Sequence, residues 1–255
     1  MTRAISGESG KRLTYRGITM SVASVTENIS DPAIGGFYTV REAARLLQIE
    51  SAPRIRGWLT GYAHRAGPII KRQYTPVSGI HEVGFLDLME IRFVEHFRKQ
   101  KISLQSLRLA AKNARKELQQ DHPFATSNVK FMTDRKEVFL HTAKVTGDKF
   151  LLNLMTNQIE IYEAFEQLLA EGVAFDPQSG IANRWSPMPA ECPNVIVDPR
   201  IAFGHPVVAP RYVPTSALFN LWKAENGNVK AVASWFHVED AAVTEAIRFE
   251  VRLTA

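Results

Sequence analysis

The stretch FYTVREAARLLQIESAPRIRGWL, residues 37–59, decides how the N-terminal half of this chain of 255 residues folds. Thr39 can cap a first helix from Val40 to Leu47, in which apolar residues recur on one face at helical spacing. After a short break, Ser51 can cap a second helix, whose first turn tolerates a proline. Two short helices joined by a turn of about three or four residues predict a helix-turn-helix, whose second helix suits a DNA major groove.

The residues that follow predict a wing. Breakers around Gly61 and Tyr62 end the second helix, IIKRQY (69–74) is typical of a short strand, and residues 77–83 give a weaker return strand. Such a hairpin would lay cationic and aromatic side chains against phosphates. The predicted DNA contacts are Thr39, Arg41, Arg45, Ser51, Arg54, Arg56, Tyr62, Lys71, Arg72 and Tyr74.

Within this set the residues have different expected roles. Arg54 and Arg56, on the second helix, would touch base edges or phosphates, and Arg41 and Arg45 would anchor the first helix. The alternative is that the two helices serve only as a packing motif and that the arginines are solvated surface charges. Because one helix-turn-helix reads only a few base pairs, a homodimer on double-stranded operator DNA is expected.

Charge is segregated along the chain. Residues 37–120 carry fifteen Lys and Arg against seven Asp and Glu, a net of +8, whereas residues 121–255 carry twelve against sixteen, a net of −4. The basic field therefore belongs to the helix-turn-helix region, which favours a polyanionic partner. The acidic remainder argues against a protein that coats nucleic acid along its whole length.

Other features bound the setting of the chain. A single cysteine, Cys192, rules out an internal disulfide and fits a reducing cytoplasm. No run approaches the roughly 18 apolar residues that span a membrane, and no hydrophobic signal core follows the N-terminus. Residues 1–36, rich in Ser, Thr and Gly, are predicted to be a flexible arm, either a tail or a segment that touches DNA.

Helices are expected over most of the remaining chain, so the fold class is mainly α with small β elements. Two amphipathic helices are predicted at 85–99 and 104–118, the second capped by Ser103. Weak alternation over 128–141 predicts a hairpin, apolar spacing over 161–169 predicts a helix, and 173–185 reads as strands around a turn at 177–180. Residues 121–190 would form this connecting α+β region.

The last predicted unit, residues 191–255, combines a Pro-rich strip with a small helical domain. Seven of the thirteen prolines lie in residues 187–214, so this strip should run extended, either as an ordered linker or as an edge that pairs with a partner. Thr215, Asn228 and Glu239 are placed to begin three successive helices. Their order resembles a second helix-turn-helix, but its acidic surroundings favour protein binding or dimerisation over DNA binding.

Two family resemblances follow from these motifs. TVREAARLL, RIRGWLTGY and the two helices after them resemble the winged-helix part of MerR-type regulators. Residues 194–252 resemble the small helical domain of VapB-type antitoxins, which partner PIN-like ribonuclease toxins. The shared features are DPRI at 198–201, GHPVV at 204–208, YVPT at 212–215 and VASWF at 232–236.

The resemblance implies a DNA-binding antitoxin of a type II toxin-antitoxin system, which represses its own operon and neutralises a PIN-like ribonuclease toxin. A basic side chain often blocks the acidic metal site of such a toxin, which makes Arg200 and Arg211 the expected partner contacts, the alternative being exposed loop charge. Competing hypotheses are a stand-alone MerR-like homodimeric regulator and a scaffold or RNA-associated protein that uses the winged helix for protein contacts.

Catalysis and metal binding are not expected. The chain has no Gly-rich phosphate loop, no GxSxG and no HExxH. Its single cysteine and seven histidines lack the spacing of zinc ligands, so neither a metal nor another cofactor is predicted. The adjacent pair Asp121 and His122 is better explained as the end of a helix than as part of a triad.

Overall fold

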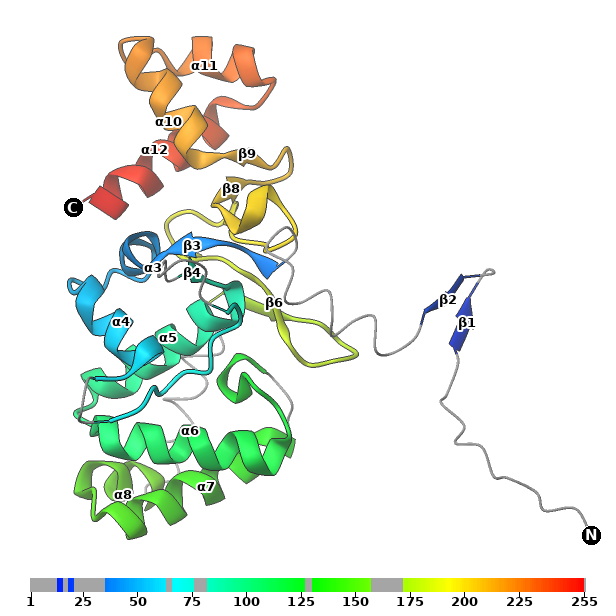
Figure 1. The fold of residues 1–255 in the computed structure, drawn as a ribbon. Coiled ribbons are helices and arrows are strands. Elements are labelled where there is room, and N and C mark those ends of the chain that lie inside the picture. The colour runs from blue at the N-terminus through cyan, green and yellow to red at the C-terminus, as the bar shows by residue number, and fades with distance from the viewer. Residues whose placement is uncertain are drawn as a thin grey trace, which may run out of the picture.

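In the computed structural model, the described residues are 35–62, 66–75, 82–126, 130–156 and 172–254, together with the backbone of a hairpin made by β1 (Leu13–Tyr15) and β2 (Ile18–Met20). The described chain is mainly helical with small β elements, which confirms the predicted fold class (Figure 1). The predicted arm of residues 1–36 falls largely outside the described residues. Over the described residues, none of the helices is both long and apolar enough to cross a membrane.

The helix-turn-helix begins where the sequence placed it. β3 (Tyr38–Thr39) leads into α3 (Val40–Leu46), and α4 (Ala52–Thr60) follows after a short turn. The Thr39 hydroxyl accepts a hydrogen bond from the Glu42 amide, and the Glu42 carboxylate accepts one from the Thr39 amide, so a capping box fixes the start of α3. Ser51 occupies the N-cap position of α4, but its side chain makes no capping hydrogen bond.

The predicted wing strand at 69–74 is wrong. Ile69 and Ile70 are both buried, which an alternating strand does not allow, and both amides donate to the carbonyl of Trp58. The return strand is β4 (Glu82–Val83), which pairs antiparallel with β3, Tyr38 opposite Val83. Residues 76–81 of the predicted hairpin lie outside the described residues.

The two amphipathic helices are confirmed as α5 (Phe85–Lys99) and α6 (Leu104–Leu118). The Ser103 hydroxyl caps α6 by accepting from the Ser106 amide. The apolar face of α5 meets an aromatic cluster, in which the rings of Phe93 and Phe124 stack with centroids 3.9 Å apart. Phe124 belongs to the 3₁₀ turn η1 (Pro123–Ala125).

The predicted hairpin at 128–141 is also wrong. The structure has the helix α7 (Lys130–Thr146), followed by α8 (Lys149–Thr156). Val138, Phe139 and Thr142 are buried together, which is the spacing of one helical face rather than of a strand. The helix predicted at 161–169 lies outside the described residues.

The C-terminal part confirms the expected strands and helices. β5 (Val173–Phe175) pairs with β6 (Ala182–Trp185), and the Pro-rich strip contributes a three-stranded sheet of β7 (Val195–Ile196), β8 (Val207–Val208) and β9 (Val213–Pro214). The strip also contains the 3₁₀ turn η2 (Ala202–Gly204).

Three helices end the chain, α10 (Thr215–Ala224), α11 (Val229–Phe236) and α12 (Asp240–Thr254). They form a module at one end of the molecule, beyond the sheet of β7–β9 (Figure 1). Asn228 caps α11 as predicted, by accepting from the Ala231 amide. Thr215 is the first residue of α10 rather than its cap, because its hydroxyl donates to the buried carboxylate of Glu250 at 2.6 Å instead.

Candidate nucleic-acid interface

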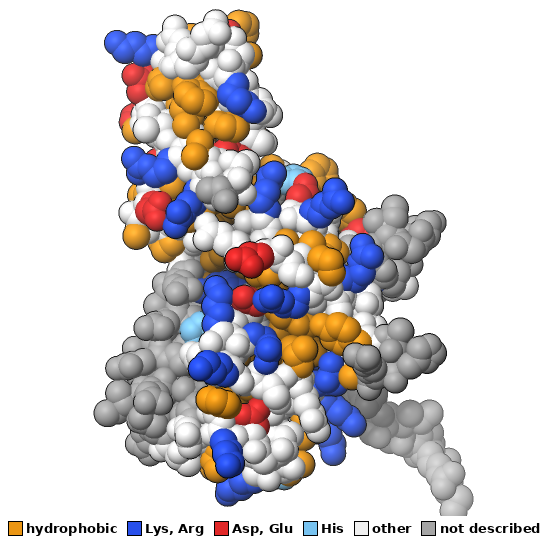
Figure 2. Space-filling view, turned by 90° about the vertical axis from the view of Figure 1, so that its left-hand side faces the viewer, with side chains coloured by type: hydrophobic (Ala, Val, Ile, Leu, Met, Phe, Trp, Pro, Cys, Tyr) orange, Lys and Arg blue, Asp and Glu red, His pale blue; other side chains and the backbone are white. Residues whose placement is uncertain are grey.

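The helix-turn-helix exposes most of its arginines. Arg41 and Arg45 lie one turn apart on α3, Arg56 lies on α4, and all three side chains are exposed. Figure 2 views the molecule from the side on which α4 lies in Figure 1 and shows Lys and Arg side chains gathered across the lower body. The rest of α4 is anchored by Ile55 and Trp58, which are fully buried.

Arg54 is placed differently from Arg56. Its Nη1 lies 3.6 Å from the carboxylate of Glu95 on α5, and about half of its side chain is exposed. In that position the Arg54 guanidinium can contact a phosphate only while it also pairs with Glu95. Arg56 is therefore the better placed of the two for a base edge.

Thr39 and Ser51 stand at the N-termini of α3 and α4. Their helix ends carry the partial positive charge that favours phosphate oxygens. The Thr39 hydroxyl is already engaged by its capping box, so any contact with a phosphate would come from the backbone or a shared hydrogen bond.

Tyr62 closes the far end of α4 and is partly exposed. Its amide and carbonyl pair with Ala66, and its ring packs against Gly57 so closely that a Cβ there would lie 2.4 Å from the ring. Glycine is thus required at position 57 for the Tyr62 ring to lie at the end of α4.

The segment Lys71–Tyr74 is tied to the body rather than free as a wing, which corrects two predicted contacts. Tyr74 is buried, and its hydroxyl donates to the carbonyl of Gly36 at 2.6 Å, so it does not face a ligand. Arg72 is largely buried and donates to the Glu82 carbonyl, with the Glu82 carboxylate 3.6 Å away. Lys71 remains exposed, 2.6 Å from the carboxylate of Asp121.

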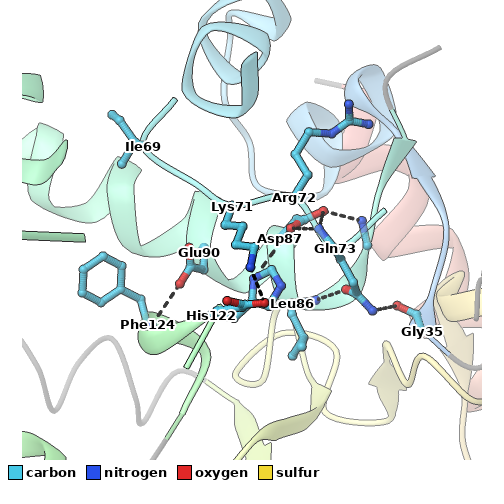
Figure 3. A network of polar contacts seen from close by, with 12 residues as sticks. Gly35, Ile69, Lys71, Arg72, Gln73, Leu86, Asp87, Glu90, His122 and Phe124 are labelled. Atoms are coloured by element: carbon cyan, nitrogen blue, oxygen red, sulfur yellow. Dashed lines mark hydrogen bonds and ion pairs between the residues drawn. The ribbon is translucent and has the colours of Figure 1, made fainter. Parts of the chain in front are cut away.

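Asp87 holds this segment in place (Figure 3). Its fully buried carboxylate accepts hydrogen bonds from the backbone amides of Gln73 and Gly84. Burial raises the pKa of Asp87 to about 7, against the lowering effect of those two amides and of Arg72. This role could not be predicted from the sequence, where Asp87 is one acidic residue in the first turn of an amphipathic helix.

His122 lies against the same carboxylate. Its Nδ1 is 3.8 Å from Asp87 Oδ1, and burial lowers the pKa of its imidazole to about 4. A neighbouring buried carboxylate, Glu90, accepts from the Phe124 amide. These contacts make the turn after α6 a structural support, in agreement with the prediction of a helix-ending turn at Asp121 and His122.

The two predicted partner contacts differ. Arg200 forms a bidentate pair with the largely buried Asp198, at 2.9 Å and 2.7 Å, which neutralises much of its charge. That hydrogen-bonded pairing raises the pKa of Arg200. Arg211 is exposed and has no ion-pair partner among the described residues, so it is the freer cation of the pair.

No chemistry emerges from the lone cysteine. Cys192 is buried beside α12, and burial raises the pKa of its thiol, followed in effect by Glu245. In the described part of the chain, no group of His, Cys, Asp and Glu side chains is arranged to hold a metal ion.

A cavity of about 540 Å³ lies beside the end of α3, the first helix of the helix-turn-helix. Its walls come from four distant segments: the end of α3, the second half of α5, the loop after β6 and the last turns of α12. Trp185 and Met188 supply apolar surface, and Arg92, Lys99 and Arg252 supply positive charge. The sequence did not predict this cavity, because its residues share no motif.

Comparison with known proteins shows similarity at the level of the fold. No family model matches the chain, and no curated protein matches it. A solved structure, the crystal structure of Rv2018 from Mycobacterium tuberculosis, is similar with a TM-score of 0.62 and 22% sequence identity, over 82% of this chain and 96% of that chain. At this identity the likeness concerns the fold alone.

Proposed function

We propose that this protein is a DNA-binding antitoxin, which binds operator DNA through α3 and α4 and holds a PIN-like ribonuclease toxin through its C-terminal half. The observation that carries the proposal is the helix-turn-helix itself, with its capped first helix and the exposed Arg41, Arg45 and Arg56. The local net charge of +8 over residues 37–120 supports a polyanionic ligand for the same region.

The surface of the C-terminal module supports the binding of a protein partner. Trp235 on α11 is 72% exposed, an unusual place for a tryptophan unless a partner covers it. Figure 2 shows hydrophobic side chains gathered on the visible face of this module. The exposed cation of Arg211 lies on the adjoining strip, just before β9, and would suit an acidic metal site in a nuclease.

DNA binding is tested by selecting duplexes from a random pool with the full chain and measuring affinity against salt. Antitoxin function predicts a selected site with two related half-sites and a steep loss of affinity with added salt. Binding that ignores sequence and salt would contradict it.

Toxin binding is tested by co-expressing the full chain with the gene that neighbours its own. The expected result is a stoichiometric complex in which RNA cleavage by the partner is suppressed, and in which Arg211→Ala restores cleavage more than Arg200→Ala does. A neighbour that neither binds nor cleaves RNA would contradict the antitoxin assignment while leaving DNA binding in place.

The cavity beside the helix-turn-helix favours a second candidate, a stand-alone homodimeric regulator that responds to a small molecule. The two candidates differ in what releases the operator. A protein partner alone would indicate the antitoxin, and a metabolite alone would indicate the regulator.

A further inference from the structure

We propose that the cavity of about 540 Å³ binds a small organic anion, a molecule with an apolar ring body and a carboxylate or phosphate group. Its volume lies within the range of roughly 300–1,000 Å³ typical of small-molecule sites, which combine apolar walls with a few polar groups. Neither operator binding nor toxin binding requires a ligand at this site.

The apolar part of the ligand has a defined surface to lie on. Trp185 is buried at the end of β6 and lines the cavity together with Met188 and Leu47. The guanidinium of Arg92 lies 6.0 Å from the centroid of the Trp185 ring, so a cation and an aromatic plane adjoin at the same wall. A flat ring would fit beside both.

The anionic group has two further cations to meet. Lys99 on α5 and Arg252 on α12 line the cavity from opposite elements, both are exposed, and neither has a hydrogen-bond or ion-pair partner in the described ranges. Two carboxylates also line the wall: Glu95, which is paired with Arg54 at 3.6 Å, and the exposed Glu191. Lys99 and Arg252 together outweigh the single charge of Glu191, so the unpaired charge that faces the cavity is mainly positive.

The cavity is also joined to the recognition helix. Glu95 lies on α5 between Arg92 and Lys99 and pairs with Arg54 on α4, while the end of α3 forms another wall. An anion in the cavity would drive Glu95 toward Arg54 by repulsion and so compete with DNA for that guanidinium. This consequence rests on the proposed function, whereas the binding of the anion does not.

Calorimetry on the full chain tests the site with three probes that share one ring system: naphthyl phosphate, naphthoate and neutral naphthol. We expect one phosphate or carboxylate probe to bind per chain, with naphthol about tenfold weaker or more, since charge-assisted hydrogen bonds contribute that much. The preferred head group then separates phosphate esters from carboxylates. Equal binding of naphthol, or no saturable binding, would overturn the proposal.

Variants locate the binding. The double variant Lys99→Glu with Arg252→Glu should weaken the anionic probes at least tenfold, whereas Lys144→Glu with Lys230→Glu, the same charge change at exposed positions elsewhere, should not. Ala190→Trp, at an exposed lining position, should block the anionic probes and naphthol alike. Unchanged binding in the first and third variants would overturn the assignment, and thermal melting confirms that each variant folds.

The coupling between probe binding and DNA binding is measured with the selected duplex. Saturating probe should lower DNA affinity about tenfold, and saturating DNA should lower probe affinity by the same factor, since coupling is reciprocal. Glu95→Gln should abolish the coupling while probe binding persists. If the probe binds but does not change DNA affinity, the site has no role in the control of DNA binding. If the free protein does not bind DNA, the proposed function is wrong, whereas the ligand site in the cavity still stands.

Discussion

The hydroxyl of Tyr38 donates a hydrogen bond of 2.8 Å to the carbonyl of Gly204, which lies 166 positions later in the chain. Next to it, the Phe37 amide donates to the Phe203 carbonyl at 2.9 Å. Tyr38 is fully buried, and burial raises the pKa of its hydroxyl, which therefore stays a donor. These bonds fasten the strand that leads into the helix-turn-helix to the Pro-rich strip of the C-terminal half.

Removing the Tyr38 hydroxyl should weaken this junction. Tyr38→Phe leaves the carbonyl of Gly204 buried without its donor, which should lower the free energy of unfolding by about 1–3 kcal/mol. Urea denaturation followed by tryptophan fluorescence measures the change. Tyr62→Phe, at a partly exposed tyrosine, is the matched control and should have little effect; equal losses in the two variants would mean that the junction is not special.

A side chain at position 204 should damage the junction from its other side. Gly204 has a φ of +82°, and a Cβ there would lie 2.3 Å from the Tyr38 hydroxyl oxygen. Gly147 has a φ of +68° with open space around it, so Gly147→Ala reports the backbone strain alone, about 1–2 kcal/mol. Gly204→Ala should destabilise the protein by more than Gly147→Ala in the same unfolding assay, and a reversed order would contradict the contact.

Asp87 and His122 should impose opposite pH dependences on stability. The pKa of Asp87 is about 7 in the folded protein against 3.8 ordinarily, so its contribution falls as pH rises over that interval. The pKa of His122 is about 4 against 6.5, so its contribution rises with pH between those values. In the wild-type protein the two trends should largely cancel between pH 4 and 6.5.

Single variants should expose each trend. Asp87→Asn should leave a protein whose unfolding free energy increases from pH 4 to 6.5, and His122→Asn one whose unfolding free energy decreases, each by a few kcal/mol, on the order of 3. Urea titrations at intermediate pH values measure both. Glu239→Gln, at an exposed carboxylate of the C-terminal module, is the control; slopes of the same sign in both buried variants would refute the opposition.

Arg56 should contribute more to operator specificity than Arg54. Arg56→Ala should cost about 1–3 kcal/mol on the selected duplex and relax preference at one base pair, as expected for a base contact. Arg54→Ala should weaken selected and random duplexes alike, since Glu95 holds that side chain beside α5. Fluorescence anisotropy measures both, with Lys144→Ala as the surface-charge control. A uniform loss for Arg56→Ala would make it a phosphate contact.

Trp235 should matter for partner binding and not for folding. Because its side chain is 72% exposed, Trp235→Ala should change the unfolding free energy by less than about 0.5 kcal/mol. The same change should weaken the toxin complex at least tenfold, the cost expected when an aromatic anchor is lost from an interface. Calorimetric titration of the partner measures it, with Val251→Ala, at another exposed apolar residue, for comparison; an unaffected complex would move the interface elsewhere.

Local signals in the sequence were enough to place α3 to α6 and α10 to α12, and to predict several of their caps. The capping box at Thr39, the caps at Ser103 and Asn228, and the apolar faces of α5 and α6 depend on residues within a few positions of one another, so they can be read directly from the chain. The strands and the turn within residues 173–185 could be predicted for the same reason.

The errors lie where distant contacts override local pattern. Residues 69–74 resemble a strand in sequence. In the structure, however, the Gln73 amide donates to the buried carboxylate of Asp87, and the Ile69 carbonyl accepts from Arg115. These backbone groups are therefore not available for pairing with another strand. Likewise 128–141 alternates weakly, but packing against α6 makes it the helix α7. Both outcomes depend on groups more than ten positions away in the chain.

What the sequence by itself determined is therefore the positions of α3 to α6 and α10 to α12 and the basic charge around the first two of these helices. Only the tertiary structure decided which of the basic residues stay exposed, that Tyr74 is buried, and that residues from α3, α5, the loop after β6 and α12 line one cavity. The reason is physical: capping and helical periodicity act over one or two turns, whereas burial and cavity walls are set by segments that meet only when the chain folds.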